Sequence, residues 1–185
     1  MQAGYDKFLV HAEGVTHSQE NGKIKDTLDN LYNVDFVAWL EAVAAQVRAG
    51  NFEAINTEHL AEELGALAKQ QKNEAAWLTI QILRNLLKLD LWNAVTEGTR
   101  RHWASELDTW WTQLGDEMTK SVRNDLAANL PSLYERAAGL YSKVITREVD
   151  PRKGGAKQPP KSCPYTLEQV LDDDFYSTYT PVCKE

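Results

Sequence analysis

The sequence is poor in the residues that mark several specialised classes of protein. Its 185 residues include two cysteines, Cys163 and Cys183, six prolines and ten glycines. Two cysteines cannot build a disulfide-rich scaffold, and a chain of this length can bury enough surface to need neither disulfides nor a structural metal. It also has no internal repeat, glycine-rich phosphate loop or low-complexity tract. We therefore expect one globular domain.

Long apolar runs and an excess of positive charge are also missing. No apolar stretch approaches the ~20 residues of a membrane span, and the apolar cluster at residues 8–10 is too short for a secretory signal. These absences predict a cytoplasmic protein with reduced cysteines and no membrane association. The 20 Lys and Arg against 27 Asp and Glu give a net charge of −7, which argues against a nucleic-acid surface covering the protein.

Helical periodicity dominates the middle of the chain. Apolar residues recur there at steps of three and four, the spacing of a helix that buries one face. The pattern predicts principal helices at about 33–49, 57–95, 103–126 and 133–147. Pro131 is expected to separate the last two, because proline suits the first turn of a helix and disfavours helix in the preceding residue. We predict an all-α fold, most simply a mostly antiparallel four-helix bundle over residues 31–148.

The two ends differ in composition from the predicted bundle. Glycines interrupt residues 1–30, which we predict to be a loosely structured arm whose order the sequence leaves open. Four of the six prolines lie within residues 149–165, so this segment should be extended. We interpret residues 149–185 as a C-terminal strap of the same domain, ending in a short helix that Thr166 caps.

One cluster has the residue types of a metal site: Glu58, His59, Glu62 and Glu63. Residues three and four apart share a helix face and can approach one ion. A di-metal carboxylate bundle, however, takes such ligands from four helices, and this sequence has one cluster. We therefore favour a solvated first helical turn and predict no cofactor or catalytic residue. A metal-dependent bundle enzyme that uses these four residues is the alternative.

Aromatic and basic residues suggest surfaces for partners. Trp77 and Trp111 lie one residue off the predicted apolar stripes, and tryptophans beyond the needs of a small core favour interfaces. Arg100 and Arg101, with the basic segment 143–161, could form local patches that bind nucleic acid weakly. Because acidic residues dominate residues 31–63, we do not expect nucleic acid to be the main partner.

An ordered set of short motifs resembles a known family. The motifs are Leu31-Tyr32-x-x-Asp35-Phe36-x-x-Trp39, Arg48-x-Gly50-x-Phe52, Leu60-x-Glu62-Glu63-Leu64, Leu86-Leu87-Lys88, Pro131-Ser132-Leu133 and Cys163-Pro164-Tyr165-Thr166-Leu167-Glu168-Gln169-Val170-Leu171. Over about residues 31–176 the chain is similar to the bacterial family known as domain of unknown function 29. The resemblance implies a compact all-α bundle without an assigned activity, cofactor or catalytic residue.

The sequence departs from the family pattern at two places. Asn85 stands where the family usually has histidine, and Leu89 stands where it usually has tryptophan. The segment after Trp103 is also less basic than the family's third helix, so the resemblance implies poor binding of polyanions. Together, these observations predict a non-enzymatic module that binds another protein or a second copy of itself.

Overall fold

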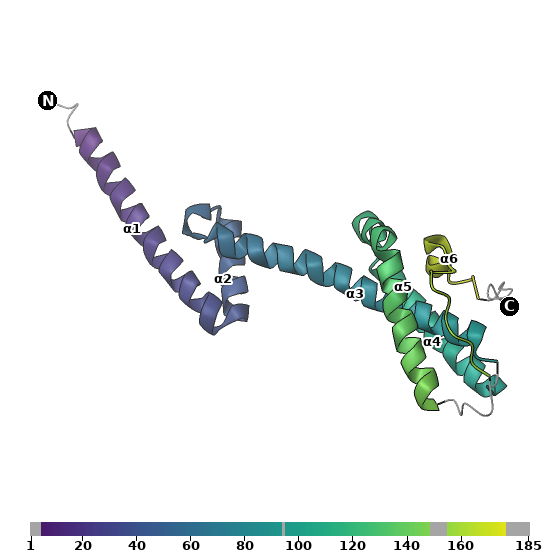
Figure 1. Ribbon diagram of the computed structural model, residues 1–185. Coiled ribbons are helices and arrows are strands. Elements are labelled where there is room, and N and C mark those ends of the chain that lie inside the picture. Colours follow the sequence, from purple (N-terminus) through teal and green to yellow (C-terminus); the bar gives the residue numbers. More distant parts are fainter. Residues whose placement is uncertain (1–4, 94, 149–154, 177–185) are drawn as a thin grey trace. The chain divides into compact units, whose positions relative to one another are not determined.

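The computed structural model describes residues 5–93, 95–148 and 155–176 (Figure 1). The all-α prediction is confirmed, because helices make up most of these residues and no strand occurs among them. An isolated bridge pairs Trp92 with Ala156. In the described part of the chain, no helix combines the length and apolar character that crossing a bilayer requires.

The chain forms two compact units, residues 1–67 and 68–185. The long helix α3, Thr57–Leu91, contributes to both. The boundaries that we predicted near residues 30 and 148 do not coincide with this division.

The first unit begins with a helix where the sequence predicted a loosely structured arm. Helix α1 spans Tyr5–Val34. Its Leu28 is 2% exposed and packs in a small cluster with Trp39, Val43 and Ile55, against which Ile24 and Leu31 also lie. Gly22 is exposed, so it costs the helix only the ~1 kcal/mol of its lower propensity. Packing against the neighbouring helix outweighs that cost.

Helix α2 spans Phe36–Ala49, which agrees within three residues with the helix predicted at about 33–49. The Asp35 carboxylate caps it by accepting a 3.1 Å hydrogen bond from the Ala38 amide. Gly50 ends it with φ at +73°, the left-handed conformation that glycine adopts without strain. A 3-10 turn, η1 (Phe52–Ala54), then leads to α3. The Asn56 side chain caps the first turn of α3 by accepting hydrogen bonds from the amides of Glu58 and His59.

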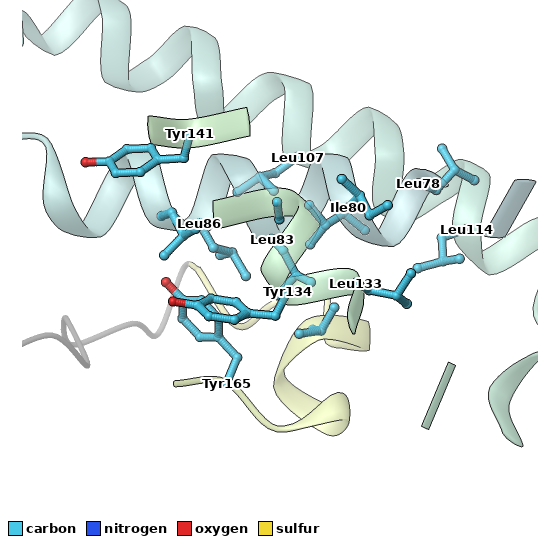
Figure 2. Packing of buried hydrophobic residues seen from close by; sticks show 14 of the residues in the cluster. Leu78, Ile80, Leu83, Leu86, Leu107, Leu114, Leu133, Tyr134, Tyr141 and Tyr165 are labelled. Carbon is cyan, nitrogen blue, oxygen red and sulfur yellow. The ribbon is translucent and has the colours of Figure 1, made fainter. Parts of the chain in front are cut away.

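The core of the second unit surrounds the C-terminal half of α3. Every residue from 78 to 92 except Arg84 is buried, which is typical of a helix with neighbours on all sides. Helices α4 (Glu97–Asp116) and α5 (Lys120–Glu148) pack against it as in a helical bundle. Figure 2 shows Leu83 and Leu86 of α3 among side chains from both neighbours.

The predicted break at Pro131 is wrong. Pro131 lies inside α5, and the actual break falls at residues 117–119. There the Gly115 carbonyl accepts a hydrogen bond from the Met118 amide, and the Thr119 hydroxyl caps α5 by accepting one from the Val122 amide. The helix continues through the proline because it buries one face on either side of it, which repays the lost backbone hydrogen bond. The buried residues of that face include Leu126, Leu133, Tyr134 and Ala137.

The predicted C-terminal strap, 149–185, falls within the described residues only over 155–176, and there it packs along the core. Within it, Tyr165 and Leu167 are buried, and Leu171 and Phe175 pack against the core. The short helix α6, Leu167–Leu171, begins where predicted. Thr166 and Gln169 form a capping box, in which each side chain accepts a hydrogen bond from the other residue's amide.

Candidate functional site

The four candidate metal ligands lie on the first two turns of α3, and two of them contact α1. The Tyr32 hydroxyl donates a 2.8 Å hydrogen bond to Glu63 Oε1, and its ring stacks on that of His59 at 4.1 Å between centroids. His59 Nδ1 lies 3.4 Å from Asp29 Oδ1, without the geometry of a hydrogen bond. Glu58 and Glu62 are exposed. Two of the four residues are therefore exposed to solvent, and the other two take part in a contact between α1 and α3.

These contacts give His59 and Glu63 a role without a metal. Among the residues that the structure describes, no three or more His, Cys, Asp and Glu side chains converge in a group that could hold an ion. The hydrogen bond to Glu63 is the largest of the effects that raise the pKa of Tyr32, followed by desolvation and by the negative charges of Glu63 and Glu62. Asp29 and Tyr32, which complete the contact, could not be singled out from spacing because they lie on another helix.

Trp111 is not an exposed interface residue. It is 6% exposed, and its indole Nε1 donates a 2.8 Å hydrogen bond to the carbonyl oxygen of Val170 in α6. The prediction assumed that a side chain one residue away from the apolar stripe would be exposed to solvent. The strap, however, covers that side of α4, so the face that buries side chains is wider than the stripe.

Trp77, the other tryptophan that we singled out, is 52% exposed. It lines a pocket of about 300 Å³ between α3 and the C-terminal end of α4. The structure thus distinguishes two tryptophans that the sequence treated alike. Trp77 remains a candidate for contact with a partner.

The two arginines at the start of α4 both have intramolecular partners. Arg100 donates a 3.0 Å hydrogen bond from Nη2 to the Leu89 carbonyl at the end of α3. Arg101 is exposed and lies 3.4 Å from the carboxylate of Glu97 one turn earlier. The hydrogen bond of Arg100 joins α4 to α3. Intramolecular partners account for the positions of both arginines without a nucleic-acid ligand.

An exposed apolar surface on α2 is the feature that the sequence assigned incorrectly. The three- and four-residue steps of the sequence predict one buried stripe through Phe36, Leu40, Val43 and Val47, but Phe36, Leu40 and Val47 are 43%, 41% and 42% exposed. Val43 of the same predicted stripe and Trp39, which was expected to widen it, are buried as predicted. The three exposed residues form one surface with Val37, which is 65% exposed, and with the half-buried Ala44. We call this surface the α2 apolar face: Phe36, Val37, Leu40, Ala44 and Val47.

Charged residues border the α2 apolar face. Glu41 and Arg48 are both exposed and lie two turns apart on its edge. Phe52, in the turn that follows α2, is 62% exposed and adds to the apolar surface of the same unit. A contiguous apolar surface with charges at its rim is the pattern of a protein-protein interface.

Cys163 offers no activated thiol. Lys157 and Lys161 are near it in the sequence and would lower its pKa if they converged on the thiol, but burial raises the pKa of Cys163, and the backbone of Tyr165 opposes that shift more weakly. The thiol donates a 3.3 Å hydrogen bond to the Tyr165 carbonyl. This residue is therefore part of the packing of the strap. Cys183 lies outside the described residues.

Comparison with known proteins assigns the family. The chain belongs to the family described as domain of unknown function DUF29, whose model matches residues 31–176. No curated protein and no solved structure gives a significant match.

Proposed function

We propose that this member of the DUF29 family is a non-enzymatic module that associates with a second copy of itself through the α2 apolar face. The observation that carries the proposal is the exposure of that face. Burial of apolar surface drives most protein association, and a helix with both a buried and an exposed apolar side has one side available for a partner. The earlier predictions of a cytoplasmic, non-enzymatic protein are part of the proposal.

A second copy fits this face because the sequence of α2 is self-complementary around Ala44. If two α2 helices cross antiparallel with Ala44 at the two-fold axis, Leu40 of one copy meets Val47 of the other. A small residue at the crossing point lets the helices approach closely. A two-fold interface repeats each contact.

The rim charges match in the same arrangement. Glu41 and Arg48 lie three and four residues on either side of Ala44, so Glu41 of one copy approaches Arg48 of the other, twice per dimer. Opposite charges that meet across an interface fix its register and orientation. A parallel pairing would keep Glu41 and Arg48 two turns apart along the helix axis and would form neither pair. Charge complementarity therefore favours the antiparallel dimer.

Sedimentation velocity of the full chain tests the proposal. We expect a reversible monomer–dimer equilibrium between about 1 and 100 µM, the range for association free energies near −5 to −8 kcal/mol. Leu40→Glu should leave a monomer, because it would bury a charge at the centre of the interface. A chain that is monomeric at every concentration would refute the proposal.

Charge reversal tests the geometry separately. Glu41→Arg and Arg48→Glu should each weaken the dimer about tenfold, since each replaces two attractive pairs with two repulsive ones. The double variant should recover the original affinity. Glu20→Arg, on an exposed position of α1, makes the same charge change away from the face and should have no effect. If the charge reversals left the dimer affinity unchanged, the dimer would form through another surface.

A further inference from the structure

The pocket beside Trp77 combines an exposed aromatic ring with carboxylates. It is lined by Glu74, Trp77 and Leu78 of α3 and by Gln113, Asp116 and Glu117 at the end of α4, and its volume is about 300 Å³. The Gln71 side chain donates a 3.4 Å hydrogen bond to Glu117 Oε2, which restrains that carboxylate. All of these residues belong to the second unit, so the pocket is independent of the α2 apolar face.

The carboxylates stand where helix electrostatics disfavour them. The C-terminal end of a helix carries a partial negative charge and is stabilised by cations. Helix α4 has no basic residue in its last turn, ends at Asp116 and has Glu117 at its C-cap. Two carboxylates thus add to the negative helix end without an offsetting base in that turn. A bound cation would relieve this repulsion.

The indole of Trp77 supplies the second half of a cation site. Tryptophan has the most favourable ring for a cation–π contact, and guanidinium or alkylammonium groups bind over its face. Trp77 is 52% exposed, and Glu74 is one turn before it on the same helix. Carboxylates on two sides of an exposed indole match a long cationic side chain, which has an apolar stem and a charged end.

We propose that this pocket binds an arginine or lysine side chain of a protein partner. The volume is at the lower end of the range for small-ligand pockets, which enclose most of their ligand. Such a site gives one anchor, and a polypeptide can supply further contact to the surface around it. The negative net charge of the chain, −7, favours the approach of a basic partner.

Peptide titration followed by NMR tests the pocket in the full chain. The probe is an acetylated and amidated Gly-Leu-Arg-Leu-Gly peptide, and its control carries neutral citrulline in place of arginine. The indole N–H signal of Trp77, assigned by its loss in Trp77→Phe, should shift with the arginine peptide below about 5 mM, a concentration that detects millimolar affinity. The citrulline peptide should shift it much less.

Two single charge removals separate the pocket from the overall charge. Asp116→Asn should weaken binding of the arginine peptide about threefold, the effect of one partly exposed ion pair. Asp173→Asn removes the same charge at an exposed position near the C-terminal end of the described chain and should leave binding unchanged. Asp116→Asn also relieves the repulsion at the helix end, so it should not impair folding.

Three results would overturn the proposal. Absence of any shift with the arginine peptide would show that the pocket takes no cationic side chain. Equal shifts with the citrulline peptide would show an apolar contact only. Tighter binding of free spermidine than of the arginine peptide, with the same dependence on Asp116, would make the ligand a free polyamine and not a protein side chain.

Discussion

The hydroxyl of Tyr165 donates a 2.5 Å hydrogen bond to Oδ2 of Asp90, and both side chains are buried. This bond joins the strap to the end of α3. Other buried aromatic residues hold the strap in a similar way. Tyr134 and Tyr141 of α5 donate hydrogen bonds to the carbonyls of Pro160 and Lys157. The polar tips of core side chains thus satisfy backbone carbonyls of residues 157–160, which belong to no helix or strand.

The Tyr165 hydroxyl should contribute measurably to stability. Tyr165→Phe keeps the ring and removes the donor to a buried carboxylate, so we expect the free energy of unfolding to fall by about 2 kcal/mol. Urea denaturation followed by tryptophan fluorescence measures it, because five of the six tryptophans belong to the second unit.

Tyr134→Phe is the matched control for that measurement. Its hydroxyl donates a 2.7 Å hydrogen bond to a neutral carbonyl, so its loss should cost only about 1 kcal/mol. If the two variants lost the same free energy of unfolding, the hydrogen bond between Tyr165 and Asp90 would stabilise the strap no more than a bond to a neutral carbonyl does.

The two tryptophans that the sequence grouped together should respond differently to truncation. Trp111→Ala removes a buried ring and its hydrogen bond to Val170, and we expect a loss of about 3–5 kcal/mol. Trp77→Ala alters an exposed side chain, so its effect should stay within about 0.5 kcal/mol. The midpoints of urea unfolding decide this. A large loss from Trp77→Ala would mean that its ring packs in solution.

Local signals in the sequence predicted the elements that local interactions determine. The cap at Thr166 follows from a residue type at a fixed place before an apolar run, and the extended strap follows from the prolines within residues 149–165. The assignment of faces failed where a distant segment decides it. Trp111 is buried because the strap covers it, and Phe36 is exposed because, within the first unit, the cluster around Leu28 covers the side of α2 that carries Trp39 and Val43.

The same limit explains why the candidate sites were only partly predicted. Spacing brought His59 and Glu63 together on α3, but Asp29 and Tyr32 approach them from another helix. The pocket beside Trp77 likewise depends on where α4 ends. The sequence suggested a different end, because Pro131 looked like the stronger break and residues 117–119 carried no proline.

Pro131 should reduce the stability of α5. Within a helix, proline removes one backbone hydrogen bond and its ring crowds the preceding turn, at a cost near 3 kcal/mol relative to alanine. Because Pro131 is exposed, Pro131→Ala loses little packing and should raise the free energy of unfolding by about 1–3 kcal/mol. The measurement is urea unfolding with Ser132→Ala as a neighbouring control. Unchanged stability would show that the proline is fully accommodated.

Tyr32 should make the stability of the first unit sensitive to alkaline pH. Its pKa is raised above the ordinary value near 10, so the folded state holds the phenolic proton more tightly than the unfolded chain does. The stabilisation is complete below that ordinary value and is lost as the pH rises through the folded pKa. Unfolding of the first unit, followed by the NMR signal of the Trp39 indole N–H, should show this decline, and Tyr32→Phe should reduce it.

Two glutamates on α3 separate the causes of that shift. Glu63→Gln removes both the carboxylate that accepts the hydrogen bond and its charge, so the pKa of Tyr32 should return towards 10. Glu62→Gln removes only the more distant charge, which has the smallest effect, and should change the pKa less. The carbon-13 shift of the Tyr32 ring, titrated by NMR, measures both. If the Glu63→Gln and wild-type titrations coincided, the contact between Tyr32 and Glu63 would not persist in solution, and the link between α1 and α3 would need another origin.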